Sequence, residues 1–171
     1  MYVNRYNSHT MKKLVADSSS IILLAKCSLV EKLTQVVEFY IPETVFEECA
    51  GEKLREKYPD AVGIWKLIEE KRIHVKTLSN KKMEKGEDEA ILLFKETKAG
   101  IFLSDDGMAI KICKVLKIPF TTSPRVVIDL YRRRVIDIDQ AREALNKLEI
   151  IGRYSKDIIS SALLELIEKR R

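Results

Sequence analysis

The stretch KLVADSSSIILLAK, residues 13–26, changes its pattern at a single aspartate, Asp17. Before this residue, Lys13 to Ala16 form a short apolar run of strand length. After it, Ser18 to Ser20 open an apolar stretch through Ala25 that is long enough for a helix, with Asp17 or a hydroxyl as the N-cap. The stretch therefore predicts a strand that leads directly into a helix, with a carboxylate at the junction.

The same alternation continues along the chain. Further strand patterns occur at Glu38–Ile41, Ile73–Leu78, Ile101–Ser104 and Pro119–Thr121. Helix patterns begin at Pro42, cover Asp60–Lys71 and Lys85–Lys98, and continue after Asp106 with Ile110, Cys113 and Leu116 on one side. Three helices finish the chain, and Asp137 and Ser155 are suitable N-caps for the last two. This order predicts an α/β fold, with a five-stranded parallel sheet flanked by helices on both faces and C-terminal helices added to it.

Composition and length favour one compact unit. The chain has 171 residues, of which 46% are hydrophobic and 33% charged, values typical of a globular protein. We expect a disordered leader at residues 1–11, the α/β domain at residues 12–136, and a helical extension at residues 137–171 packed on the same domain. No apolar run is long enough for a membrane span. Three cysteines without zinc-ligand spacing predict reduced thiols in the cytoplasm.

Acidic residues follow two of the predicted strands. Asp17 ends the first strand, and the pair Asp105–Asp106 ends the fourth. In open parallel sheets, ligands bind beyond the carboxyl ends of the strands, where the winding reverses. If the two strands are neighbours, their carboxylates share one crevice and could bind Mg²⁺, which prefers oxygen ligands. Alternatively, each aspartate is only the N-cap of the helix that follows it.

Four segments together resemble the PIN-domain nuclease family, which includes VapC-like toxin ribonucleases. The first is residues 14–26, where a strand ends in Asp17 and Ser19 follows two residues later. The others are IPETVFEE at residues 41–48, KGEDEAI at residues 85–91 and FLSDD at residues 102–106. The resemblance extends from Lys12 to about Ile136. One departure is Thr122-Ser123-Pro124, where relatives often have Gly-Thr after the fifth strand.

The resemblance implies an endoribonuclease that hydrolyses phosphodiester bonds of single-stranded or loop RNA with Mg²⁺ or Mn²⁺. It implies a supporting hydroxyl at Ser19, and a register that is open by one residue at Glu47/Glu48, Asp88/Glu89 and Asp105/Asp106. The metal ligands it implies are Asp17, Glu48, Glu89 and Asp106, with Asp105 as a close neighbour. As an alternative, Glu48 and Glu89 are ordinary solvent-exposed helix residues.

The partners also follow from the resemblance. Relatives that act as toxins imply a small antitoxin protein and a homodimer. A housekeeping RNA-processing nuclease and a catalytically silent RNA- or protein-binding module remain alternatives. The net charge of +5 favours a polyanionic partner, and Lys71-Arg72, Lys81-Lys82 and Arg132–Arg134 could contact phosphates or simply be solvated. With only two histidines, a His-based hydrolase is disfavoured.

Overall fold

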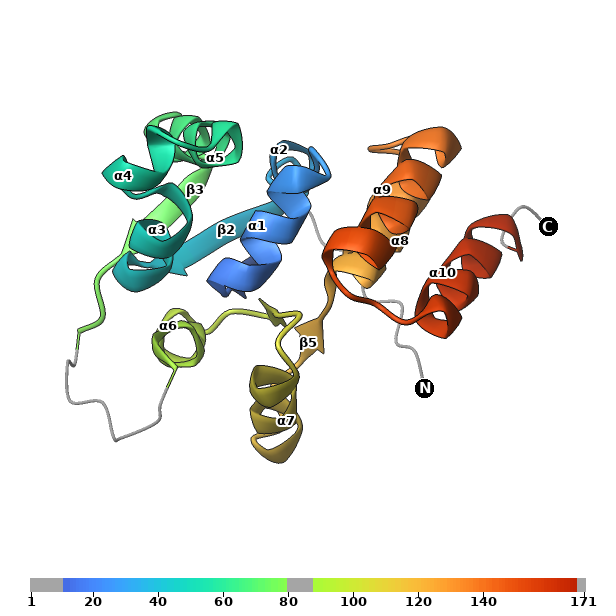
Figure 1. Ribbon diagram of the computed structural model, residues 1–171. Helices are drawn as coiled ribbons and strands as arrows, with labels where there is room; N and C mark the ends of the chain where they lie inside the picture. The colour runs from blue at the N-terminus through green and yellow to red at the C-terminus, as the bar shows by residue number, and fades with distance from the viewer. Residues whose placement is uncertain (1–10, 80–87, 169–171) are drawn as a thin grey trace.

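The computed structural model describes residues 11–79 and 88–168 of the chain. The strands are β1 (Lys12–Ala16), β2 (Val37–Pro42), β3 (Ile73–Lys76), β4 (Ile101–Leu103) and β5 (Phe120–Thr121). The helices are α1 (Ser18–Lys26), α2 (Val30–Leu33), α3 (Glu43–Ala50), α4 (Glu52–Arg55), α5 (Pro59–Glu69), α6 (Glu89–Thr97), α7 (Gly107–Val115), α8 (Ser123–Arg132), α9 (Ile138–Ile151) and α10 (Lys156–Glu168). All strand pairs are parallel, in the order β3-β2-β1-β4-β5 (Figure 1). The predicted fold class is therefore confirmed.

Three details differ from the sequence-based expectation. Helices α2 and α4 were not predicted, because four residues are too short to show a helical period. Pro42 ends β2 and is the N-cap of α3 instead of its first residue. Within the described residues α6 starts at Glu89, with Asp88 as its N-cap; residues 85–87 of the predicted helix lie outside the described part.

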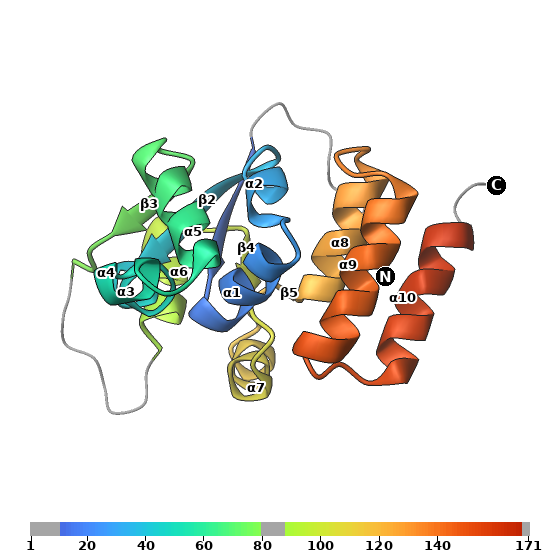
Figure 2. The same ribbon diagram turned by 45° about the horizontal axis from the view of Figure 1, so that its top comes forward.

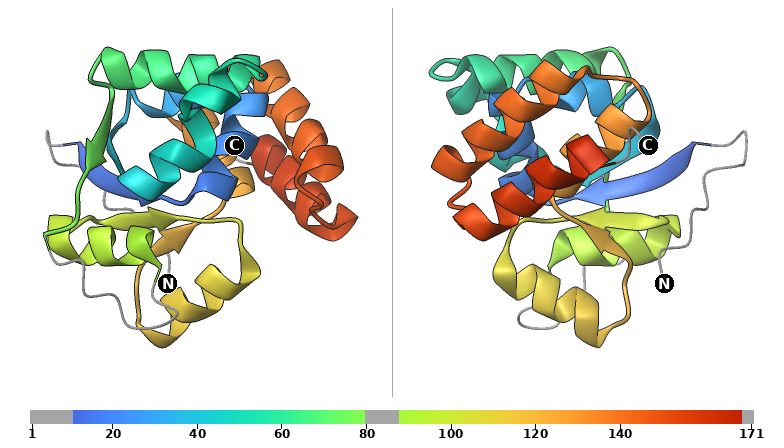
Figure 3. Two further views of the ribbon diagram at one scale, coloured as in Figure 1. Left: turned by 60° about the vertical axis from the view of Figure 1, so that its left-hand side comes forward. Right: turned by 90° about the vertical axis from the view of Figure 1, so that its right-hand side faces the viewer.

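The helices form layers on the two faces of the sheet. Figure 3 shows α6 and α7 below the sheet, whereas α1, α5 and α8–α10 lie above it. This division follows from the strand order, because the chain moves outward in one direction from β1 to β3 and in the other from β4 to β5. Figure 2 shows α8, α9 and α10 side by side at one end of the molecule.

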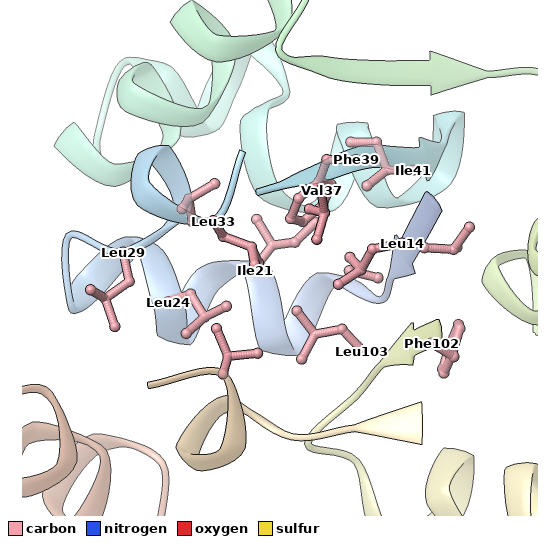
Figure 4. Close-up of a cluster of buried hydrophobic side chains, with 14 of the residues drawn as sticks. Leu14, Ile21, Leu24, Leu29, Leu33, Val37, Phe39, Ile41, Phe102 and Leu103 are labelled. Atoms are coloured by element: carbon pink, nitrogen blue, oxygen red, sulfur yellow. The ribbon is translucent and has the colours of Figure 1, made fainter. Parts of the chain in front are cut away.

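The core surrounds the central strand. Val15 and Ala16 of β1 are completely buried, as expected for a parallel strand covered by helices on both faces. Ile21 and Leu24 of α1 are also fully buried, and Figure 4 shows them among the side chains of the neighbouring strands. Burying each such side chain contributes about 1.5–3 kcal/mol. The core thus holds the start of α1 firmly against the end of β1.

Buried apolar contacts and side-chain ion pairs connect the C-terminal helices to the rest of the fold. Leu145, Ile159 and Leu166 are each no more than 1% exposed. Glu165 of α10 accepts hydrogen bonds from Arg125 at 3.0 Å and from Arg132 at 2.6 Å, both on α8. Within residues 11–79 and 88–168, no helix has the length and apolar character needed to cross a bilayer.

Candidate active site

The two acidic strand ends are neighbours in the sheet. Strands β1 and β4 pair directly, with Ala16 opposite Leu103, and the Asp17 N–H donates to the Leu103 carbonyl at 3.2 Å. The chain leaves β1 toward β2 on one side and reaches β4 on the other, so this is the switch point of the sheet. Strands β1 and β4 are therefore neighbours, which is the condition under which their carboxylates were expected to lie near each other.

Asp17 is held by three donors and is 8% exposed. Its Oδ1 accepts from the Ser20 N–H at 3.0 Å and from the Ser19 hydroxyl at 2.9 Å, and its Oδ2 accepts from the Ser104 hydroxyl. Three donors on two oxygens fix the orientation of the carboxylate. Asp17 is therefore an N-cap of α1 and a fixed carboxylate at the sheet edge at the same time, and Ser19 has the supporting position that was predicted for it.

Ser104 joins the two strand ends, although sequence reasoning did not select it. Its side chain is fully buried, donates to Asp17 and accepts from the Asp106 N–H at 3.1 Å. The available signal was a lone hydroxyl between the apolar strand residues and the Asp105–Asp106 pair. Its role appears only when β1 and β4 are placed side by side.

The two adjacent aspartates point in different directions. Asp106 is exposed and caps α7, with its Oδ1 accepting from the Met108 and Ala109 N–H groups at 2.9 and 2.8 Å. Asp105 is half-buried and accepts from the Ser123 N–H at 2.8 Å, from the Ser123 hydroxyl and from the Tyr154 hydroxyl. The segment Thr122-Ser123-Pro124 differs from the Gly-Thr of many relatives, but Ser123 still provides a hydroxyl there. This hydroxyl donates to Asp105.

Asp88 is a third acidic N-cap, at the start of α6. It caps α6 by accepting from the Ala90 N–H at 2.8 Å. Burial, and then the nearby charges of Asp17 and Glu48, raise the pKa of the Asp88 carboxyl above its ordinary value, although the Ala90 hydrogen bond lowers it. Of the two registers left open here, Asp88 is the N-cap of α6 and Glu89 is its first residue.

Glu89 and Glu48 lie on the α3 side of the site. The Glu89 carboxylate accepts from the Thr44 hydroxyl at 2.7 Å and so connects α6 to α3. Glu48 is exposed and borders a groove of about 670 Å³. The groove also has Glu43, Glu47 and Glu69 in its lining, together with apolar surface from Phe46 and Trp65.

Each of three helix N-termini donates hydrogen bonds to one of these carboxylates. The first turns of α1, α6 and α7 donate backbone N–H groups to Asp17, Asp88 and Asp106 respectively. The partial positive charge at a helix N-terminus stabilises an anion there. These N-termini offset part of the repulsion among the carboxylates, which explains how the fold tolerates them close together.

The donor set suits a hard divalent cation. Carboxylate oxygens are the preferred ligands of Mg²⁺. Burial is the main cause of the raised pKa of Asp88, and a cation would offset the smaller effect of the Asp17 and Glu48 charges. In the part of the chain that the structure describes, no three acidic, histidine or cysteine side chains are already arranged to hold a metal ion. Glu48 is exposed and can change rotamer, whereas a rotamer change of Asp106 would cost the two backbone hydrogen bonds by which it caps α7.

The basic residues considered as phosphate contacts have partners within the fold. Arg132 pairs with Glu165 at 2.6 Å, and Arg72 donates to Glu31 at 3.1 Å. Arg133 donates to the Val36 carbonyl at 3.5 Å. Lys81 and Lys82 lie outside the described residues.

Comparison with known proteins gives the family. A family model described as a PIN domain, DUF3368, matches residues 13–169, which includes the C-terminal helices as well as the sheet. Searches among curated proteins and among solved structures returned no match. The strand order, the carboxylates at the switch point and the match over nearly the whole length agree, and the chain belongs to the PIN-domain family, a nuclease family.

Proposed function

We propose that the protein is a divalent-metal-dependent endoribonuclease that hydrolyses phosphodiester bonds in single-stranded or loop RNA. The observation that carries the proposal is that two acidic residues, Asp17 and Asp106, follow the paired strands β1 and β4 at the switch point. The charges of Asp17 and Glu48 add to the effect of burial in raising the pKa of Asp88, which supports placing Asp88 near them. The PIN-domain match supports the reaction class.

The residues proposed to hold Mg²⁺ or Mn²⁺ are Asp17, Glu48 and Asp106, with Asp88 in place of Glu89. When bound, such a cation stabilises negative charge that develops on phosphate oxygens. Ser19, Ser104 and the start of α1 hold the Asp17 carboxylate in its orientation. Glu89 then helps to hold α6 against α3 by accepting from Thr44. Asp105 helps to hold the end of β4 against the start of α8 by accepting from Ser123.

The first experiment measures cleavage of a fluorescently labelled, unstructured RNA in EDTA, Mg²⁺ and Mn²⁺. We expect no cleavage in EDTA and activity with either cation. Asp17→Asn and Asp106→Asn should each lower the rate by about 10²-fold or more, because a lost metal ligand removes several kcal/mol of transition-state stabilisation.

Asp137→Asn provides a matched control. Asp137 is the N-cap of α9, in a capping box with Gln140, so this variant makes the same change at a helix N-terminus outside the proposed site. It should cleave RNA at the wild-type rate. Undiminished cleavage in EDTA would refute the metal-dependent mechanism, and a folded protein that neither cleaves RNA nor binds Mn²⁺ would instead be the silent binding module.

The groove beside Glu48 supports a toxin role over a housekeeping one. Its four glutamates and apolar surface suit a basic, amphipathic segment of a partner protein, and such a segment would lie over the proposed metal ligand Glu48. We propose that a small antitoxin binds there. The test is a titration with a synthetic basic amphipathic peptide, which should inhibit the wild type and lose potency against a Glu43→Gln/Glu69→Gln variant.

We also propose a homodimer in the cytoplasm. Exposed apolar residues at the C-terminal end of the molecule, Ile150, Leu164 and Ile167, are more than half exposed and offer surface for self-association. Light scattering on the purified protein checks the mass. The free thiols of Cys27, Cys49 and Cys113 suit a reducing compartment.

A further inference from the structure

Tyr154, in the turn between α9 and α10, connects the C-terminal extension to the proposed nuclease site. Its hydroxyl donates to Asp105 Oδ1, the same oxygen that accepts the Ser123 N–H, while the Ser123 hydroxyl donates to Oδ2. Both oxygens of Asp105 are therefore engaged by groups from elsewhere in the chain.

Asp105 stands between two residues that build the site. Ser104 donates to Asp17, and the Asp106 N–H donates to Ser104. Holding the Asp105 side chain consequently fixes the backbone from which Ser104 and Asp106 project. A shift of this backbone would move Asp17 and Asp106 relative to each other.

The tyrosine is itself positioned by its surroundings. A Cβ added at Gly152 would lie 3.0 Å from Tyr154 Cδ2 and 2.7 Å from the Leu148 carbonyl oxygen, so the ring occupies the space that glycine leaves open. Burial, and then the Asp105 charge, raise the pKa of the Tyr154 hydroxyl far above its ordinary value. The hydroxyl therefore stays protonated and remains a donor.

We propose that Tyr154 is a positioning residue of the nuclease site: by holding Asp105 it makes the α9–α10 extension part of the frame that aligns Asp17 and Asp106. Asp105 is then an anchor for this frame and not a metal ligand. The proposal rests on the proposed function for its catalytic consequence, but the alignment itself can be measured without any cleavage.

The test compares Tyr154→Phe, Asp105→Asn and their double variant, with Tyr131→Phe as the matched control, since Tyr131 is another half-buried tyrosine on a C-terminal helix, α8. Hydrogen exchange of residues 104–106 is followed in EDTA, and Mn²⁺ affinity is measured by paramagnetic resonance. We expect Tyr154→Phe to accelerate that exchange by about 10-fold and to weaken Mn²⁺ binding by about 3- to 10-fold, the size expected for one hydrogen bond to a carboxylate. Tyr131→Phe should change neither.

The double variant separates an anchor from a ligand. If Asp105 acts through Tyr154, the double variant should resemble Asp105→Asn alone, because both changes remove the same contact. If Asp105→Asn abolishes Mn²⁺ binding while Tyr154→Phe leaves it intact or tightens it, Asp105 is a ligand and the proposal is wrong. Unchanged exchange in Tyr154→Phe would also overturn it.

Activity measurements keep the two proposals distinct. With RNA as substrate, Tyr154→Phe should lower kcat by about 10-fold and leave KM nearly unchanged, because alignment and not RNA binding is lost. If the wild type cleaves no RNA but Tyr154→Phe still accelerates exchange at residues 104–106, the nuclease function fails and the positioning role stands. Gly152→Ala, which crowds the ring without removing its hydroxyl, should accelerate exchange at the same residues; slow, wild-type exchange there would contradict the proposed placement of Tyr154.

Discussion

Replacing Asp17 by asparagine separates a metal site from a simple helix cap by stability alone. Asparagine retains the oxygen that accepts from the Ser19 hydroxyl and the Ser20 N–H, and it is a good N-cap. It loses the oxygen that accepts from Ser104, which costs about 1.5–3 kcal/mol for one hydrogen bond to a charged group.

Removal of the Asp17 charge acts in the opposite direction. Asp88 feels that charge, and the repulsion between two such carboxylates is on the order of 2 kcal/mol at an effective dielectric near 20, before protonation of Asp88 reduces it. The two effects nearly cancel. In EDTA we therefore expect the free energy of unfolding of Asp17→Asn to lie within about 1 kcal/mol of the wild-type value.

Added Mg²⁺ should distinguish the two proteins. With a dissociation constant of about 1 mM, about 10 mM Mg²⁺ stabilises the wild type by roughly 1.4 kcal/mol. For a domain of this size the melting temperature then rises by about 3–6 °C. Asp17→Asn should rise by less than about 1 °C, because an amide is a much weaker ligand for Mg²⁺ than a carboxylate.

The assay consists of melting curves by circular dichroism, each recorded in EDTA and in Mg²⁺. Asp137→Asn is the control, since it changes a helix cap without touching the site, and it should respond to Mg²⁺ as the wild type does. An equal Mg²⁺ response in wild type and Asp17→Asn would refute Asp17 as a ligand. Absence of a response in the wild type would refute the metal site as a whole.

Three more outcomes can be checked with single variants or reagents. Ser104→Ala should destabilise the fold by about 1–3 kcal/mol in urea titrations and slow RNA cleavage, because Asp17 loses a donor and the Asp106 N–H loses an acceptor in a buried place. Glu165→Gln should lower stability by about 1–3 kcal/mol, since Arg125 and Arg132 lose their common charged partner, whereas cleavage should remain close to the wild-type rate. Burial raises the pKa of the Cys49 thiol to about 12 from its ordinary value of 9.0, so the thiol stays protonated below that pH; iodoacetamide at pH 8.5 should label it only after unfolding, and rapid labelling of the native protein would contradict its burial.

Three N-caps show why both sequence-based interpretations of the aspartates can hold together. Asp17, Asp88 and Asp106 each accept backbone N–H groups from the helix that follows, as ordinary caps do. The same helix N-termini provide positive potential where the carboxylates gather. Capping and clustering are thus one arrangement, and only a metal-dependent measurement separates its two consequences.

The sequence by itself determined the order of strands and helices, the acidic strand ends and the family. These features are local: the change of pattern at Asp17, the Asp105–Asp106 pair after an apolar strand and the capping residue Asp137 are read within a few neighbouring positions. A strand of apolar residues followed by a capped helix has a preferred conformation almost independently of its surroundings. The parallel α/β fold then follows from the alternation of these elements.

Only the tertiary structure decided which residues meet. The link from Ser104 to Asp17 spans 87 positions and the link from Tyr154 to Asp105 spans 49, so no local pattern could reveal either. The physical reason is the same in each case: a side-chain contact depends on the packing of whole elements around a common core, and that packing is set by the complete set of buried residues.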